Sequence, residues 1–241
     1  MTPLLELEHV SKSFGAVRVA DDVNLRVEAG EVVGVVGPNG AGKTSLMNLV
    51  AGTLPLDAGR IRFEGSDVTR LPPHERCRTG IGRTHQIPQP FEELTVFENI
   101  LVGLRFGGLD RSQDPPGFGI LLLQRVDLAG KANSAAGSLT LLERKRLELA
   151  RALATSPRLL LLDEIGGGLV EAEIELLIGT IEDLRREGLT IVWIEHIVHA
   201  LVSVVDRLVA MDFGRVLMDG PPAEVMTNPE VQAVYMGLVD D

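Results

Sequence analysis

One stretch of the sequence decides the fold, Gly37-Pro38-Asn39-Gly40-Ala41-Gly42-Lys43-Thr44, which follows the apolar run 32–36 and precedes the helix-like segment 45–50. Glycine at the turning positions lets successive backbone N–H groups point inward around phosphate oxygens, and the following helix adds the positive end of its dipole. We expect Lys43 to reach the β- and γ-phosphates and Thr44 to hold Mg²⁺. A glycine-rich turn matches this context by chance about once in a hundred. The stretch therefore predicts a P-loop for ATP or GTP, with nucleotide contacts from Gly37, Asn39, Gly40, Ala41, Gly42, Lys43, Thr44 and Ser45.

The composition narrows the class of protein. A chain of 241 residues with 45% hydrophobic content forms a full core as one large domain. The formal net charge of -11 argues against a nucleic-acid partner, because Lys and Arg supply the affinity for phosphate backbones. The single cysteine, Cys77, excludes an internal disulfide and fits a reducing cytosol. No apolar run approaches the roughly 18 residues of a membrane span, and residues 1–10 lack a signal pattern. A membrane role is therefore expected to come through a partner.

Short β-rich runs alternate with helical patterns, which is typical of an α/β fold with a mainly parallel central sheet. Strands are expected at 4–10, 23–27, 32–36, 60–63, 159–162, 190–194 and 208–211, and helices up to 51 and at 141–154 and 171–187. The segment 88–137 breaks the alternation, because 96–106 and 120–126 look helical around a Gly/Pro-rich loop at 107–119. We therefore expect a single domain, 1–241. Its nucleotide-binding core is 1–87 and 138–241, and 88–137 is an inserted helical subdomain.

Two carboxylates, Asp163 and Glu164, follow the apolar run 159–162. Ligands of open α/β sheets bind at the carboxyl ends of buried parallel strands, so a charged pair there points to the site. We expect Asp163 to hold Mg²⁺ through water and Glu164 to act on the attacking water as general base or polariser. An acidic turn that merely caps a strand is the alternative, with odds of about one in ten beside a P-loop.

Two further polar residues lie after neighbouring segments. His196 follows the strand 190–194, where its imidazole is expected to contact the γ-phosphate and hold the water against Glu164. Gln86 ends the run 80–85 and adjoins the helical insertion, so its amide is placed to touch both the metal site and the insertion. A lone histidine is usually a surface or structural residue, which is our interpretation of His9, His74 and His199.

Together these residues resemble the ATP-binding subunit of ABC transporters, over essentially the whole chain. Gln86 falls at the Q-loop of that family, and His196 falls at its switch histidine. Asp163 and Glu164 fall at its Walker B pair. Phe14 falls where the family places an aromatic ring against adenine, with a buried core Phe as the alternative. The resemblance implies a P-loop NTPase (RecA-like) core with a mainly parallel sheet, an antiparallel β part at the N-terminus and an inserted α-helical subdomain.

Within the family, the segments 82–86, 91–99 and 228–237 look most like branched-chain amino-acid importers. Such importers pair two different ATPase subunits with two integral membrane permeases and a separate extracytoplasmic solute-binding protein. The resemblance thus implies ATP hydrolysis with Mg²⁺ at the cytoplasmic face of the inner membrane. Gln86 and the segment 88–137 are expected to receive a coupling element of the permease. The apolar candidates for that groove, whose alternative place is the insertion's own core, are Phe91, Leu94, Val96 and Phe97.

The family signature Leu-Ser-Gly-Gly-Gln is altered here to Leu139-Thr140-Leu141-Leu142-Glu143. Thr140 still supplies a hydroxyl for the ATP of the opposite subunit, and the Thr-x-x-Glu spacing predicts a capping box at a helix start. Leucines replace the glycines that permit close approach, and Glu143 brings negative charge toward a phosphate. Two interpretations are about equally open: the altered signature is impaired, or the variation is tolerated. A heterodimer would confine the fault to one of two sites, so we expect a different ATPase subunit as partner.

Three other functions compete with this interpretation. The nearest is an importer of the same architecture for urea, amides or other small polar solutes. A soluble ABC ATPase of DNA repair or translation would be expected to show a long coiled coil, two ATPase domains or basic surfaces, which this sequence lacks. A regulatory clamp that binds ATP without turnover is disfavoured by Glu164 and His196.

Overall fold

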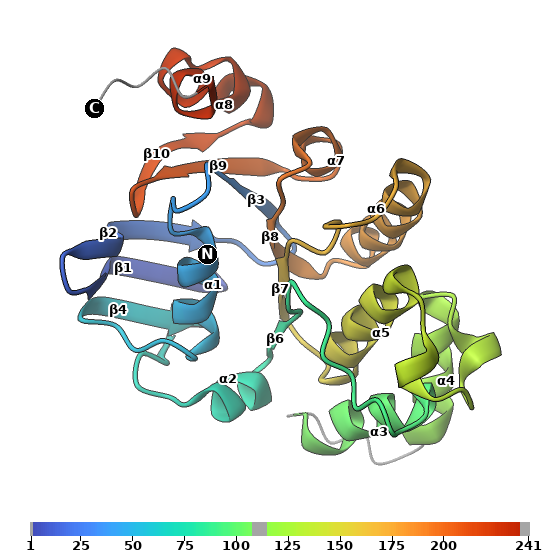
Figure 1. The fold of residues 1–241 in the computed structure, drawn as a ribbon. Helices are drawn as coiled ribbons and strands as arrows, with labels where there is room; N and C mark the ends of the chain where they lie inside the picture. Colours follow the sequence, from blue (N-terminus) through green and yellow to red (C-terminus); the bar gives the residue numbers. More distant parts are fainter. Residues whose placement is uncertain (1, 108–114, 237–241) are drawn as a thin grey trace.

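The computed structural model describes residues 2–107 and 115–236. An antiparallel sheet in the order β2-β1-β4-β5 carries the N-terminal part of the chain (Figure 1). Its strands are β1 Leu5–Phe14, β2 Val17–Val27, β4 Ala58–Phe63 and β5 Ser66–Asp67. The predicted strands at 4–10 and 23–27 are the apolar ends of longer strands. The remainder escaped prediction because one face of an antiparallel sheet is solvated and its polar residues mask the pattern.

A second sheet runs in the order β10-β9-β3-β8-β7-β6. Its pairs are parallel from β9 to β6, and only the outermost pair, β10 with β9, is antiparallel. Every residue of the central strands β3, β7 and β8 is buried, as expected for parallel strands covered on both faces. The strands are β3 Val32–Val36, β6 Ile81–Arg83, β7 Leu159–Asp163, β8 Thr190–Ile194, β9 Arg207–Asp212 and β10 Arg215–Gly220. The mainly parallel sheet and the antiparallel N-terminal part are thus confirmed.

Alternate residues of the parallel strands face two separate cores. Leu159 and Leu161 of β7 pack with the antiparallel sheet and with α1, which lies between the sheets. Leu160 and Leu162 pack instead on the opposite side, with residues of α3, α5 and α6. The helices are α1 Lys43–Ala51, α2 Pro73–Thr79, α3 Val96–Phe106, α4 Pro115–Arg125, α5 Leu141–Ala154, α6 Glu171–Arg186, α7 Val198–Val202, α8 Pro222–Thr227 and α9 Pro229–Met236. None of these helices is both long and apolar enough to cross a membrane.

The region predicted as a helical insertion does contain helices, with one boundary corrected. The Gly/Pro-rich loop predicted at 107–119 is wrong at its end, because α4 already begins at Pro115. Proline fits the first turn of a helix, where its missing N–H is not needed. Residues 108–114 of that predicted loop lie outside the described part of the chain. Both α3 and α4 pack against α5, which the sequence assigned to the core, so the subdomain limits at 88 and 137 stay a prediction.

Candidate functional site

The glycines of the P-loop are required by close backbone approach. Gly37 has φ 153° and Gly42 has φ 99°. A Cβ on Gly37 would lie 2.2 Å from the carbonyl oxygen of Met211, and one on Gly42 would lie 2.3 Å from that of Val19. Only glycine therefore lets the loop pass between β9 and β2 before α1 starts at Lys43. Asn39, Gly40 and Thr44 are exposed at the surface, Ser45 is half-buried, and Ala41 is buried.

Lys43 is folded into the loop that precedes it. Its side chain is 5% exposed, and Nζ donates to the carbonyls of Gly37 at 2.7 Å and Pro38 at 2.8 Å. Burial lowers the pKa of the Lys43 ammonium, while the carboxylates of Glu164 and Asp163 act in the opposite direction. The ammonium thus occupies the centre of the loop and faces the two carboxylates across it.

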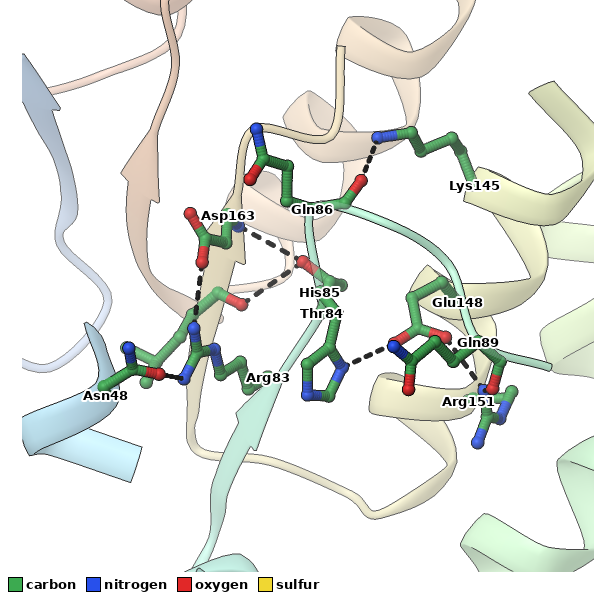
Figure 2. A network of polar contacts seen from close by, with 11 residues as sticks. Asn48, Arg83, Thr84, His85, Gln86, Gln89, Lys145, Glu148, Arg151 and Asp163 are labelled. Carbon is green, nitrogen blue, oxygen red and sulfur yellow. Dashed lines mark hydrogen bonds and ion pairs between the residues drawn. The ribbon is translucent and has the colours of Figure 1, made fainter. Parts of the chain in front are cut away.

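Asp163 ends β7 with one carboxylate oxygen engaged and one free. Oδ2 accepts from Arg83 at 2.9 Å, and Arg83 also donates to Oδ1 of Asn48 in α1 at 2.6 Å (Figure 2). The backbone N–H of Asp163 donates to the Thr84 hydroxyl at 3.2 Å. Oδ1 of Asp163 is buried without a hydrogen-bond partner. A buried carboxylate oxygen without a hydrogen-bond partner is energetically unfavourable, so this atom fits a hard cation or the water ligand of such a cation.

Glu164 is held between the two residues that the sequence placed beside it. Its Oε1 lies 2.6 Å from Nε2 of His196, and its Oε2 accepts from Nε2 of Gln86. The backbone of Glu164 has φ 46°, in the left-handed region that a non-glycine residue enters only when its surroundings hold it there. The structure therefore brings Gln86, Asp163, Glu164 and His196 together at the carboxyl ends of β6, β7 and β8, beside Lys43.

The altered signature forms the predicted capping box at the start of α5. Thr140 Oγ1 accepts from the N–H of Glu143 at 3.4 Å, and the Glu143 carboxylate accepts from the N–H of Thr140 at 3.0 Å. The other Glu143 oxygen pairs with Lys131 at 2.5 Å, and this contact lowers the pKa of the Glu143 carboxyl. The negative charge that the sequence placed toward a phosphate is thus neutralised within the chain. Leu141 is 44% exposed beside it.

Phe14 ends β1 and is 55% exposed, so the alternative of a buried core Phe is wrong. Nζ of Lys12 lies 5.4 Å from the centre of its ring. Among the four groove candidates, Val96 is fully buried and belongs to the core, so its docking role is wrong. Phe97 packs partly buried against the same core and Leu94 is half-buried, whereas Phe91 is 47% exposed.

A groove of about 620 Å³ runs between α2, β6, α3 and α5. Its walls combine apolar and basic side chains, namely Cys77, Arg83, His85, Phe91, Phe106 and Arg151. Nδ1 of His85 lies 2.9 Å from the buried Glu148, which also accepts from Arg151 at 2.9 Å, and Arg151 stacks 5.1 Å above the Phe91 ring. Figure 2 shows the contacts among His85, Glu148 and Arg151, and His85 is the residue before Gln86 in the chain.

Comparison with known proteins places this architecture in a family. Residues 20–166 match the ABC transporter family, and residues 215–240 match the C-terminal segment described as "Branched-chain amino acid ATP-binding cassette transporter". The chain belongs to the ABC transporter family. It is an ATPase that binds ATP and ADP, and ATP-binding subunits of this family work with membrane permease components.

Three relatives cover nearly the whole ABC subunit. The high-affinity branched-chain amino acid transport ATP-binding protein BraF of Pseudomonas aeruginosa is 35% identical, with 98% of each chain covered. The lipopolysaccharide export system ATP-binding protein LptB of Haemophilus influenzae is 34% identical, with 97% of each covered. The crystal structure of the ADP conformation of an ABC transporter cassette superposes with a TM-score of 0.89 at 30% identity, covering 98% of this chain and 100% of that one.

Sequence reasoning missed two cations of the site, Arg83 and Lys145. Arg83 ends β6, a strand of three residues that is too short to show a period. Lys145 falls within a helix pattern, where a lysine is usually solvated, so its burial was not expected. The need for charge balance was the signal that could have indicated these two cations, because carboxylates buried at strand ends require cations from elsewhere in the chain.

Lys43→Ala is expected to weaken ATP binding by about 10- to 150-fold, because a charge-assisted hydrogen bond contributes about 1.5–3 kcal/mol. The measurement is the Kd for ATP by calorimetry. Arg186→Ala is the matched control, since it also removes one positive charge but lies 68% exposed on α6. An affinity of Lys43→Ala equal to that of the control would refute the P-loop assignment.

Proposed function

We propose that this ABC ATPase powers the import of branched-chain or other small amino acids. The observation that carries the proposal is the C-terminal match to the branched-chain family at residues 215–240, joined to a complete hydrolytic constellation around Glu164. The relative named for branched-chain amino acid transport and the one named for lipopolysaccharide export are nearly equally similar over their whole length. The C-terminal segment therefore favours amino acids.

The roles of the site residues follow from their places. We assign Lys43, the loop backbone and Ser45 to the phosphates, and Phe14, exposed at the end of β1, to the adenine. Glu164 takes a proton from the water that attacks the γ-phosphorus, while the bond from that phosphorus to the bridging oxygen breaks and ADP leaves. His196, whose Nε2 already faces Glu164, contacts the γ-phosphate and steadies that water.

Mg²⁺ fits the same site. Thr44, Gln86 and Asp163 would hold it, with the orphaned Oδ1 of Asp163 reaching it through water. The ion would supply charge neutralisation for the phosphate oxygens. Arg83 keeps the Asp163 carboxylate in one orientation by binding its other oxygen, so this chain sets the direction of the ligand.

We propose that the groove between α2, β6, α3 and α5 receives a cytoplasmic segment of an integral membrane permease. Phe91 supplies exposed apolar area there, and His85 adjoins Gln86, so a docked segment lies one residue from the nucleotide site. The subunit then sits at the cytoplasmic face of the inner membrane. An extracytoplasmic solute-binding protein delivers the solute to the permease, and nucleic acid plays no part.

We further propose a heterodimer with a different ATPase subunit. The family signature has glycines at these two positions, where their backbone would approach the partner's ATP. Here both positions carry leucine, Leu141 and Leu142, and the exposed side chain of Leu141 makes that surface bulkier. The capping box leaves Thr140 at the surface for the same nucleotide. In a homodimer both ATP sites would carry this altered signature. In a heterodimer, the ATP on this chain's own P-loop would meet the unaltered signature of the partner.

Glu164→Gln is expected to abolish turnover at this chain's own ATP site while ATP binding persists, because the base is lost and the P-loop is intact. Such a loss costs a factor of roughly 100 to 10,000 in rate. Phosphate release by the assembled transporter and uptake of labelled leucine into vesicles are the two measurements. Wild-type hydrolysis would exclude Glu164 as the base, and hydrolysis without leucine uptake by the wild-type complex would exclude leucine as the solute.

A photo-reactive benzoylphenylalanine at Phe91 is expected to cross-link to the permease, because the exposed ring lines the groove. The same probe at Phe213, which is 77% exposed in the turn between β9 and β10, is the matched control and should not reach it. Mass spectrometry of the adduct identifies the permease segment. Capture from Phe213 with none from Phe91 would place the docking surface elsewhere.

Restoring Leu141→Gly, Leu142→Gly and Glu143→Gln should raise hydrolysis at the site built from the partner's P-loop. Placing these changes in a Glu164→Gln background silences this chain's own site, so phosphate release reports the other site alone. Every 1.4 kcal/mol recovered in the transition state gives about tenfold in rate. Glu143→Gln alone is the control, since glutamine keeps the cap. An unchanged rate, or rapid cooperative hydrolysis by the purified wild-type chain alone, would contradict the heterodimer proposal.

A further inference from the structure

Lys145, in the second turn of α5, joins three segments of the site at one buried point. Its side chain is 3% exposed. Nζ donates to the backbone carbonyl of Gln86 at 2.6 Å, the contact drawn in Figure 2, and to the backbone carbonyl of Glu164 at 3.1 Å. The ammonium thereby connects α5 with the residues that follow β6 and with those that follow β7.

A buried ammonium at this place is costly, so its presence calls for a reason. Burial lowers the pKa of the Lys145 ammonium, and the carboxylates of Glu195 and Glu164 oppose this effect. Glu195 is 2% exposed, and its two oxygens accept from the N–H groups of Gly166 at 3.0 Å and His196 at 3.1 Å. These two hydrogen bonds hold the Glu195 carboxylate in place, and it acts on the pKa of Lys145 without a direct ion pair.

The two carbonyls that Lys145 binds belong to residues whose side chains touch each other. The Glu164 backbone is pinned at both polar atoms: its N–H donates to the carbonyl of Ile194 at 2.9 Å, and its carbonyl accepts from Lys145 and from the N–H of Gly167 at 3.2 Å. This pinning accompanies the left-handed φ of 46°. The Nζ contacts therefore fix backbone atoms of the same two residues whose side chains meet, the amide of Gln86 and the carboxylate of Glu164.

We propose that Lys145 is a positioning residue that sets Gln86 against Glu164 and makes both follow the helix that begins after Thr140. Five residues of helix, about 7.5 Å of rise, separate Lys145 from Thr140. A displacement of the signature end of α5 is then transmitted to the catalytic carboxylate by hydrogen bonds, without passing through the P-loop. The inference rests on the roles proposed above for Gln86 and Glu164.

The test compares Lys145→Met with Arg146→Met in the assembled transporter. Arg146 is the next residue of α5, is 12% exposed and pairs with Asp127 at 2.9 Å. Lys145→Met should lower kcat by about 10- to 100-fold, since two charge-assisted hydrogen bonds are lost, while the KM for ATP stays within about twofold of wild type. Arg146→Met should leave both kcat and KM unchanged.

The outcomes separate positioning from simple stability. An unchanged kcat in Lys145→Met, or a rise in KM without a fall in kcat, overturns the inference. Equal losses in Lys145→Met and Arg146→Met overturn it as well, because general loosening of α5 would then suffice. If Lys145→Met does not assemble, Lys145→Arg answers the question, because its longer side chain shifts the two carbonyls while retaining the charge. A fall in kcat at constant KM supports positioning, and wild-type kcat overturns it.

Glu164→Gln in the same complex distinguishes this inference from the proposed function. If Glu164→Gln hydrolyses ATP at the wild-type rate, the role of Glu164 fails, and the inference fails with it. If Glu164→Gln is inactive and Lys145→Met retains wild-type kcat, only the inference fails.

Discussion

Charge buried at the carboxyl ends of β7 and β8 must be compensated inside the fold, and the arrangement of the site follows from this requirement. Asp163, Glu164 and Glu195 are each at most 9% exposed. An isolated carboxylate in such surroundings costs several kcal/mol, which hydrogen bonds and nearby cations offset. Each of the three carboxylates accepts hydrogen bonds from a different set of donors, so each is held in its own place. These donors fix the orientation of the carboxylates, and one oxygen of Asp163 is left without a partner.

Local constraints were predictable from the sequence, and long-range ones were not. Glycine at 37 and 42 is required by backbone crowding within a few residues, and the capping box at Thr140 spans only three. The carboxylates at 163 and 164 were placed correctly because a strand end is itself a sequence signal. In contrast, Arg83 reaches Asp163 across 80 residues of chain, and Lys145 reaches Gln86 across 59. No periodicity encodes such pairs.

Short elements were the other source of error. The segments α2, α7, α8, α9, β5, β6 and β10 contain between two and eight residues each and were not predicted. A helix of seven residues completes about two turns, too few to display an apolar face. Two of these elements, α2 and β6, form one side of the groove, so the prediction lacked part of a candidate binding surface as well as part of the topology. Val96 was misassigned to that groove for a related reason: composition does not say which side of an amphipathic helix finds a core.

Near-equal similarity to an amino acid transport subunit and to a lipopolysaccharide export subunit has a physical explanation. In the roles proposed here, the P-loop and the strand-end carboxylates act on ATP, and both relatives are named as ATP-binding proteins. Residues that meet a partner are a small share of the chain and hardly affect overall identity. The groove and the C-terminal segment at 215–240 are where such differences are expected to gather.

The cap of α5 also separates the folding of this helix from the surface that its first turn presents to a partner. Because Thr140, Glu143 and Lys131 satisfy the start of this helix among themselves, the exposed side chain of Leu141 takes no part in the cap. A mutation at this position therefore leaves the cap intact. In the proposed dimer, its effect falls on the nucleotide that this surface meets in the partner subunit. In the proposed assembly with two unlike ATPase chains, such a position is free to change as long as the other active site sustains the cycle, so the two subunits can come to contribute unequally to hydrolysis.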